Sequence, residues 1–197
     1  WREDLKISMP SIPYSQTKYI IENILHYNYL NSKNKLSIAV LRYFNPIGAH
    51  ESGLIGECSK NSSNLIPSII DTLNGDNKAL NIYGDDYDTL DGTGIRDYIH
   101  VFDLISGHIK ALNFLVQNGG FNVWNLGSGM GYSVMEVVKK FEHISGKSIP
   151  LKLQPRRKGD LSQYWADISK AKLELKWTPN KNLDDMVIDT INYINQF

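Results

Sequence analysis

Two patterns of apolar residues divide the chain into predicted helices and strands. Apolar residues at helical spacing predict six helices, at residues 14–29, 65–73, 103–116, 133–144, 169–175 and 183–194. Short apolar or alternating runs predict four strands, at residues 36–44, 79–83, 121–126 and 151–153. Because these strands and helices alternate along the chain, we expect an α/β fold with parallel strand pairing.

Turn-forming residues predict the loops between these elements. Asn45 and Pro46 are expected to end the first strand, and the polar residues 48–64 then form a long loop. Loops of this length in compact domains are usually functional or disordered. A second loop, rich in acids and glycines, is expected over residues 84–94, just before the third helix.

Residues 91–101 form the most informative run of the sequence. Gly92 and Gly94 allow the backbone to approach a ligand closely, and the planar guanidinium of Arg96 suits a phosphate or pyrophosphate. A structural ion pair between Arg96 and its neighbour Asp97 is the alternative interpretation. On these residues alone both interpretations stay open.

Composition restricts the classes of function. The chain has 197 residues, is 42% hydrophobic, and carries 21 basic and 21 acidic residues, so no net charge attracts nucleic acid. The single cysteine, Cys58, fits a reducing compartment, and we expect the cytoplasm. The five histidines show no metal-ligand spacing, so we expect no metal site. No apolar run reaches the ~18 residues that a membrane span needs.

A tyrosine and a lysine four residues apart begin the first predicted helix. The spacing of Tyr14 and Lys18 places both side chains on one helical face, where the ammonium lowers the pKa of the phenol and favours a base at neutral pH. Tyr29 and Lys33 match the same pattern at the frayed end of the helix, which we interpret as chance. From the residues alone, Tyr14 and Lys18 are a catalytic pair or an ordinary surface pair.

Two further segments could contact an anion. Residues 156–160 contain two arginines and a lysine beside a glycine, which is typical of a local anion site or of a solvated charged face. Residues 126–131 follow a strand and precede a helix, as a nucleotide-binding glycine loop does. Their glycine spacing departs from that fingerprint, and the ribose-binding acid about 20 residues later is absent. We therefore interpret residues 126–131 as a tight turn between strand and helix.

The order and spacing of these motifs resemble the UDP-galactose 4-epimerases, a branch of the extended short-chain dehydrogenase/reductase family. The resemblance runs from about Pro13 to near the end of the chain. It rests on the Tyr-x-x-x-Lys pair, on residues 41–50 and 91–101, and on the runs Asn-Leu-x-Pro, Asn-Leu-Gly-x-Gly, Pro-Arg-Arg-x-Gly-Asp and Tyr-Trp-Ala-Asp. Each motif is weak or moderate alone, and the combination is specific.

The resemblance implies an NAD-dependent enzyme that interconverts UDP-glucose and UDP-galactose through a 4-keto sugar. It implies that Tyr14 is the catalytic base and acid, that Lys18 tunes it at the nicotinamide ribose, and that Tyr43 and Phe44 border the NAD site. It further implies that Arg96 and Arg157 hold the diphosphate. The remaining substrate-binding residues would be Asn45, Asn64, Leu65, Leu80, Asn81, Ile82, Tyr83, Lys158, Gly159, Asp160 and Tyr164.

The resemblance also implies a domain arrangement. Residues 1–60 and 98–146 would form the C-terminal part of a Rossmann-like parallel sheet, and residues 61–97 and 147–197 a smaller α/β domain that binds the UDP-sugar. The glycine fingerprint for NAD and the catalytic Ser/Thr upstream of Tyr14 are missing from the sequence. We therefore expect a fragment that is inactive alone, whose full-length form is a homodimer through the helix of residues 14–29.

Two other functions are compatible with these residues. One is a related UDP-sugar enzyme of the same fold, such as a decarboxylase or a dehydratase. The other is a truncated UDP-sugar-binding module without catalysis. The resemblance also implies that Tyr164 borders the 2-substituent of the hexose, where its bulk would exclude an N-acetyl group.

Overall fold

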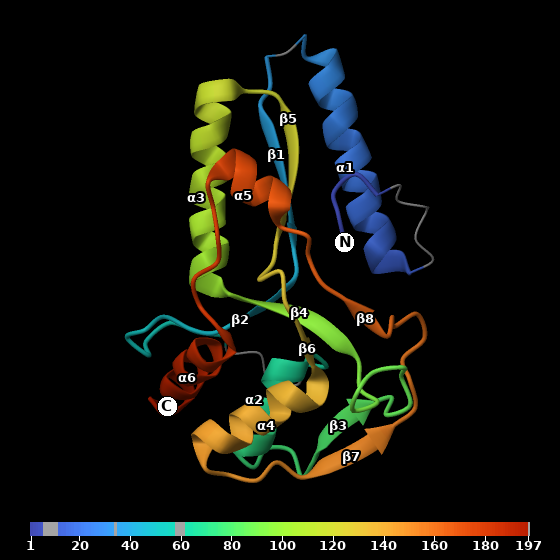
Figure 1. The fold of residues 1–197 in the computed structure, drawn as a ribbon, viewed down its shortest axis with the longest axis vertical. Coiled ribbons are helices and arrows are strands. Elements are labelled where there is room, and N and C mark those ends of the chain that lie inside the picture. Colours follow the sequence, from blue (N-terminus) through green and yellow to red (C-terminus); the bar gives the residue numbers. More distant parts are fainter. Residues whose placement is uncertain (6–11, 34, 58–61, 197) are drawn as a thin grey trace.

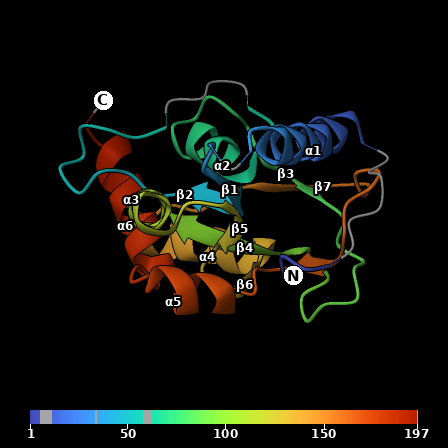
Figure 2. The ribbon, with the colours of Figure 1, turned by 90° about the horizontal axis from the view of Figure 1, so that it is seen from above.

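The computed structural model describes residues 1–5, 12–33, 35–57 and 62–196, which fold into an elongated α/β molecule (Figure 1). The upper half in Figure 1 holds two parallel strands, paired from Ile38↔Phe121 to Tyr43↔Leu126. Helices lie on both sides of these two strands, as the view from above also shows (Figure 2). The elements of this half are α1 (Pro13–Asn31), β1 (Ile38–Tyr43), α3 (Val101–Asn118), β5 (Phe121–Leu126) and α5 (Ser169–Leu175).

The lower half in Figure 1 is built on a second pair of parallel strands, paired from Leu80↔Leu151 to Tyr83↔Gln154. Three helices pack beside these strands around a shared apolar core. The elements of this half are α2 (Leu65–Leu73), β3 (Leu80–Tyr83), α4 (Val134–Ser145), β7 (Leu151–Gln154) and α6 (Leu183–Ile194).

A small sheet centred on one strand joins the two halves. The central strand, β4 (Ile95–His100), pairs with β2 (Asn45–Ile47) and β8 (Gln163–Tyr164) in parallel, and with β6 (Gly131–Ser133) in antiparallel orientation. Side chains of a strand alternate between its faces. Tyr98 accordingly packs in the core of the lower half, whereas Ile99 packs in the core of the upper half.

The predicted α/β class and the parallel pairing are confirmed, and each of the six predicted helices is present. The first strand, β1, ends at Tyr43, before Asn45 and Pro46 as expected, but a separate strand that was not predicted, β2, covers Asn45–Ile47. Pro46 can lie in a strand here since β2 pairs only with β4. The loop-like residues 91–101 contain β4, which the apolar pattern concealed because Asp97 and His100 are buried polar residues.

Local capping explains where two helices of the lower half begin. The Ser133 hydroxyl accepts a hydrogen bond from the N–H of Glu136, whose carboxylate accepts one from the N–H of Ser133. Asn182 and Asp185 make the same reciprocal pair at the start of α6. Each pair satisfies two donors that a helix N-terminus otherwise leaves open, so both helices start at fixed residues.

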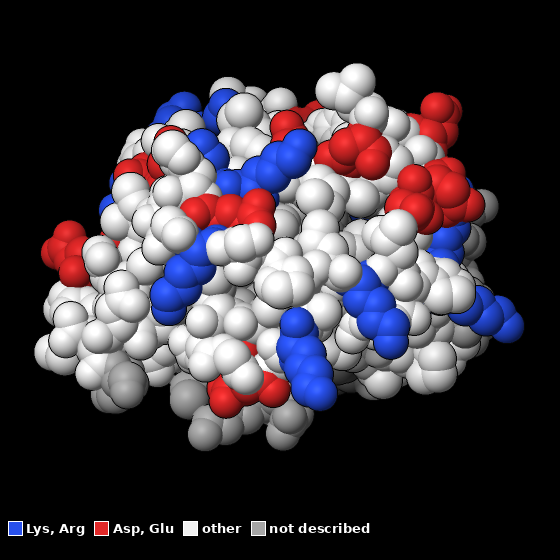
Figure 3. All heavy atoms as spheres, turned by 90° about the horizontal axis from the view of Figure 1, so that it is seen from below, with Lys and Arg blue, Asp and Glu red and all other residues white. Residues whose placement is uncertain are grey.

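Surface charge and helix hydropathy add two observations. The face seen from below carries lysines, arginines and acids interspersed, without a large field of one sign (Figure 3). None of the helices in the described ranges is long and apolar enough to cross a membrane. Within the same ranges, no group of three or more His, Cys, Asp or Glu side chains could hold a metal ion. Cys58 lies outside the described residues.

Candidate functional site

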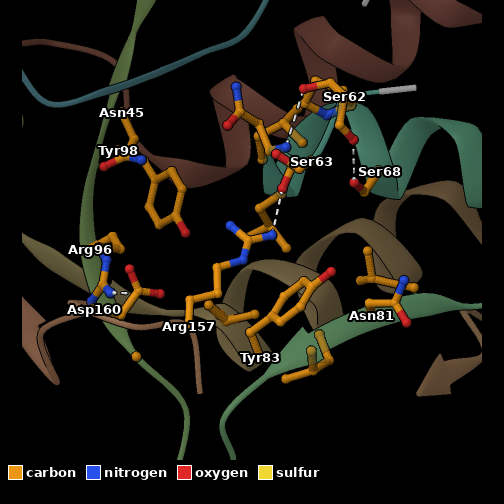
Figure 4. Close-up of a pocket in the computed structure, with 18 of the residues that line it drawn as sticks. Asn45, Ser62, Ser63, Ser68, Asn81, Tyr83, Arg96, Tyr98, Arg157 and Asp160 are labelled. Atoms are coloured by element: carbon orange, nitrogen blue, oxygen red, sulfur yellow. Dashed lines mark hydrogen bonds and ion pairs between the residues drawn. The ribbon is translucent and has the colours of Figure 1, made fainter. Parts of the chain in front are cut away.

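A cavity of about 720 Å³ opens in the lower half, between the starts of β2, β4 and α2, the strand β3, and the segment after β7 (Figure 4). Asn45 and Arg157 follow the carboxyl ends of β1 and β7, where ligands of parallel α/β sheets commonly bind. Eleven of the sequence-predicted site residues line it together: Asn45, Asn64, Leu65, Leu80, Asn81, Ile82, Tyr83, Arg96, Arg157, Asp160 and Tyr164.

Arg96 is the most enclosed cation of this cavity, with a side chain only 13% exposed. Its guanidinium lies 4.7 Å from the centre of the Tyr164 ring and 3.9 Å from a carboxylate oxygen of Asp160. One of its N–H groups donates to the carbonyl of Ile95 at 2.8 Å. Arg96 does not pair with Asp97, so the alternative of a structural ion pair between these neighbours was wrong. The half-buried guanidinium keeps donors available for an anion.

Arg157 lines the cavity next to Asp160, which lies between it and Arg96 (Figure 4). Its guanidinium lies 3.9 Å from the centre of the Tyr83 ring, and one N–H donates to the carbonyl of Ser63 at 2.8 Å (Figure 4). A tight turn brings Arg157 close to Asp160, whose N–H donates to the Arg157 carbonyl at 3.2 Å. Gly159 adopts φ +89° in this turn, a conformation that glycine takes without strain. The cavity thus holds two arginines, each next to a tyrosine ring.

The strand β3 and the start of α2 form the remaining walls. Leu80 and Ile82 face the apolar core, while Asn81 and Tyr83 alternate to the exposed face. Asn64 precedes the first turn of α2 without a capping hydrogen bond from its side chain. The open N–H groups of a helix N-terminus and the amide of Asn45 therefore add neutral polar groups to the two cations.

Tyr98 is a cavity residue that the sequence analysis missed. Its ring packs in the lower core and is 2% exposed, and its hydroxyl points into the cavity (Figure 4). Burial raises the pKa of this hydroxyl well above its ordinary value, so Tyr98 remains a neutral donor. Arg96 and Tyr98 share one face of β4, two residues apart. Recognising β4 as a strand would have given this signal.

Burial has the same effect on the second tyrosine of the cavity. Desolvation is the main cause that raises the pKa of the Tyr164 hydroxyl, and the charge of Arg96 opposes it. Tyr164 therefore also carries its proton at neutral pH. Its ring is fixed by Arg96 on one side and by Phe44, whose ring centre lies 6.0 Å away.

Six predicted site residues lie outside the lining of this cavity. Tyr14 is 71% exposed on the first turn of α1, with the Lys18 ammonium 5.2 Å from the centre of its ring. The Tyr43 hydroxyl contacts the imidazole of His108 at 2.5 Å, and Phe44 adjoins the cavity only through Tyr164. The other two are Lys158 and Gly159, which form the exposed tip of the turn between Arg157 and Asp160.

The residues expected at a nicotinamide cofactor lie on an open surface. Tyr14 and Lys18 begin α1, at its lower end in Figure 1, while Tyr43 and Phe44 end β1. The lysine ammonium beside the phenol is a donor set that fits a ribose hydroxyl and a proton-transfer site. The glycine run 126–131 does not fit a phosphate, because Asp97 occupies the hollow of that turn. The run connects β5 to the short strand β6, which precedes α4, so the expected direct turn from strand to helix was wrong.

Parallel strands crossed by helices define a Rossmann-like α/β protein, and its cavity contains two arginines and several aromatic rings. The chain belongs to the family described as GDP-mannose 4,6 dehydratase, whose model matches residues 2–190.

Individual relatives narrow the comparison. The UDP-glucose 4-epimerase of Erwinia amylovora is 45% identical over 195 residues, which are 98% of this chain and 58% of the relative. The UDP-glucose 4-epimerase of Stenotrophomonas maltophila, solved with bound NAD and formylated UDP-arabinopyranose, is 41% identical with a TM-score of 0.94. The match covers 100% of this chain and 58% of the solved chain. The UDP-glucose 4-epimerase of Bifidobacterium longum, solved in complex with NAD+ and UDP, is 43% identical with a TM-score of 0.92. That match covers 98% of this chain and 58% of the solved chain. The chain thus spans somewhat more than half the length of these relatives.

Proposed function

We propose that the full-length protein interconverts UDP-glucose and UDP-galactose with bound NAD, as an enzyme of galactose metabolism. The observation that carries the proposal is the cavity that Arg96 and Arg157 line together, each beside a tyrosine ring. Two cations suit the two phosphates of a nucleoside diphosphate, and an aromatic face suits its base. The similarity to UDP-glucose 4-epimerases solved with NAD and UDP supports the same ligands.

Two tasks are divided between the two halves of the chain. In the lower half, Arg96, Arg157 and Asp160 hold the UDP part, while the sugar extends toward Tyr164. In the upper half, Tyr14 acts as the base for the proton of the sugar C4 hydroxyl, with the Lys18 ammonium beside its ring. NAD supplies the reversible hydride acceptor when bound. The 4-keto sugar must turn before its C4 is reduced from the other face, so a firm grip on UDP and a weak grip on the hexose are required.

The proposal also includes the domain division, the oligomeric state and the cellular location of the protein. The division into two domains, with boundaries at residues 60, 97 and 146, stays a prediction. In that division α4 belongs to the dinucleotide-binding part but packs in the lower core, and α5 belongs to the sugar-binding part but packs in the upper core. A homodimer through α1 would cover its exposed residues Ile20, Ile21 and Ile24. The content of one cysteine favours a cytoplasmic location.

The alternatives are a UDP-sugar decarboxylase or dehydratase of the same fold, and a binding module without catalysis. The named relatives are epimerases, which favours epimerisation over both. An activity assay with UDP-glucose, and with UDP-glucuronic acid as the decarboxylase substrate, distinguishes the three possibilities in one experiment.

The direct test is Tyr14→Phe in the full-length protein. Removal of the proton-transfer hydroxyl should lower turnover of UDP-galactose by about 10²-fold or more, while the affinity for UDP stays near normal. Tyr29→Phe is a matched control, since Tyr29 belongs to the second Tyr-x-x-x-Lys match and packs its ring against Phe121. Near-normal turnover by Tyr14→Phe would exclude Tyr14 as the base.

A further inference from the structure

Asp97 is a fully buried carboxylate whose hydrogen bonds all come from two distant segments. Its Oδ1 accepts from the N–H and the hydroxyl of Ser128, at 2.7 and 2.6 Å. Its Oδ2 accepts from the N–H groups of Gly129 and Ala166, both at 3.0 Å. None of the ion pairs found among the described residues includes Asp97. Four charge-assisted hydrogen bonds thus replace the solvation of this carboxylate.

The glycine run after β5 is shaped to receive these groups. A Cβ on Gly127 would lie 2.5 Å from the Asp97 Oδ2 and 2.7 Å from the Ala166 Cβ. A Cβ on Gly131 would lie 3.0 Å from the ring of Trp165. Any larger side chain at either glycine would displace the chain around residues 165 and 166. The run that resembles a nucleotide loop is therefore a socket for Asp97 and for the segment that follows β8.

This socket lies directly behind one wall of the cavity. Arg96 and Asp97 are neighbours on β4 and point to opposite faces, so Arg96 enters the cavity while Asp97 enters the socket. Tyr164 is the register partner of Arg96 in β8, two residues before Ala166. The strand β8 has only two residues and pairs with β4 over that length. The bond from Ala166 to Asp97 is consequently a main anchor of the Tyr164 wall.

We propose that Asp97 is a positioning residue that holds the Tyr164 wall in place and thereby limits the size of the sugar that the cavity accepts. The proposal rests on the proposed function, in which Tyr164 faces the hexose. Asp97 does not touch the substrate. It acts through the Ala166 N–H on one side of Tyr164 and shares β4 with Arg96, which lies over the Tyr164 ring.

The test is Asp97→Asn in the full-length protein, assayed with UDP-galactose and with UDP-N-acetylgalactosamine. Asparagine keeps the volume of aspartate, but its NH2 group cannot accept a hydrogen bond, so one pair of donors loses its partner in either orientation. We expect the ratio of kcat/KM for the N-acetylated substrate over UDP-galactose to rise about tenfold, because one anchored wall loses its charge-assisted bonds. The affinity for UDP-N-acetylgalactosamine relative to that for UDP-galactose, measured by calorimetry, should also rise.

A double-mutant cycle of Asp97→Asn and Tyr164→Cys distinguishes a positioning role of Asp97 from a general structural role. Tyr164→Cys should raise the same ratio by itself, and Asp97→Asn should add little in the double variant, because both changes open the same wall. Asp91→Asn is the matched control. Its carboxylate also accepts hydrogen bonds, from Thr93 and Ser133, but it has no bond to the segment after β8. Asp91→Asn should leave the ratio unchanged.

A milder variant covers the case in which Asp97→Asn does not fold. Ser128→Ala removes one of the four hydrogen bonds and should raise the ratio by a smaller factor in the same direction. An unchanged ratio in an active Asp97→Asn or Ser128→Ala enzyme, or full additivity with Tyr164→Cys, overturns the positioning role alone. A wild-type protein that neither binds nor converts either UDP-sugar contradicts the proposed function, and the positioning role with it.

Discussion

The helices α1 and α2 both carry isoleucines and leucines, which lie in opposite environments. Six of the nine residues of α2 are buried, including Ile69 at 0% exposure, whereas none of the described residues of the 19-residue α1 is buried. On α1 the side chains of Ile20, Ile21 and Ile24 are 48%, 49% and 53% exposed. The comparison teaches that an apolar helical stripe specifies that a helix must be covered, but not by which surface.

The two halves of the molecule repeat this contrast. The lower half encloses a core with six or more fully buried side chains, among them Phe141 and Val187, and its cavity is complete within the chain. In the upper half, every residue of β1 is partly or largely exposed, and α3 presents Ile109 and Leu112 to solvent. A parallel strand is normally covered on both faces, so the upper half offers large apolar surfaces for further packing.

The largest expected effect comes from the core of the lower half. Ile69→Ala should lower the free energy of unfolding by about 2–5 kcal/mol, because it leaves a cavity among fully packed side chains. Ile24→Ala on α1 should change it by only about 0.5 kcal/mol in the 197-residue chain. Urea unfolding, followed by circular dichroism, measures both values.

The same pair of variants in the full-length protein sharpens the comparison. If α1 is covered there, by a second subunit or by other residues, Ile24→Ala becomes clearly destabilising while the effect of Ile69→Ala stays the same. Equal costs for the two variants in the 197-residue chain would contradict the difference between the two helices.

The next effect concerns the two adjacent arginines of the cavity rim. Arg157→Ala should weaken UDP binding roughly 10- to 100-fold, since it removes a charge-assisted contact of about 1.5–3 kcal/mol. Arg156→Ala is the control, because Arg156 does not itself line the cavity and bonds the exposed Asp86. Calorimetric titration with UDP and with uridine measures the affinity of each variant and of the wild type for both ligands. Similar losses in both variants, or equal wild-type affinity for UDP and uridine, would remove Arg157 from the diphosphate site.

The smallest effect is a pH dependence at the junction of the halves. His100 is fully buried, and desolvation lowers its pKa below the ordinary 6.5, although the nearby Asp189 carboxylate opposes this. Below about pH 6.5 the unfolded chain binds a proton that the folded chain refuses, so stability should fall as the pH drops from that value. The loss should be of the order of 1 kcal/mol or less.

The variant His100→Asn tests this assignment. Asparagine retains an acceptor for the N–H of Phe102 at the start of α3, but it does not titrate. Unfolding free energies at about pH 7.5 and 5.5 should therefore differ less in His100→Asn than in the wild type. The exposed His143, changed to Asn, should keep the wild-type difference. A wild-type slope in His100→Asn would show that other groups cause the pH dependence.

Much of the fold could be predicted because periodicity reports burial. The six helices and the strands β1, β3, β5 and β7 follow from spacing and apolar runs alone. The short strands β2, β4, β6 and β8 could not be predicted. Their pairing depends on partners 34 or more residues away, as in Asp97↔Gly131, and Asp97 and His100 break the apolar pattern of β4.

The sequence by itself determined the residue types of the site: a turn that requires Gly159, two arginines that can hold an anion, and a Tyr/Lys pair at helical spacing. Only the tertiary structure decided how they are grouped. It brought Arg96 and Arg157 into one cavity, added Tyr98, and placed the glycine run against Asp97. The reason is physical: spacing along the chain fixes neighbours within one helix or strand, whereas a cavity is made by side chains from several elements whose packing minimises exposed apolar surface and unpaired polar groups.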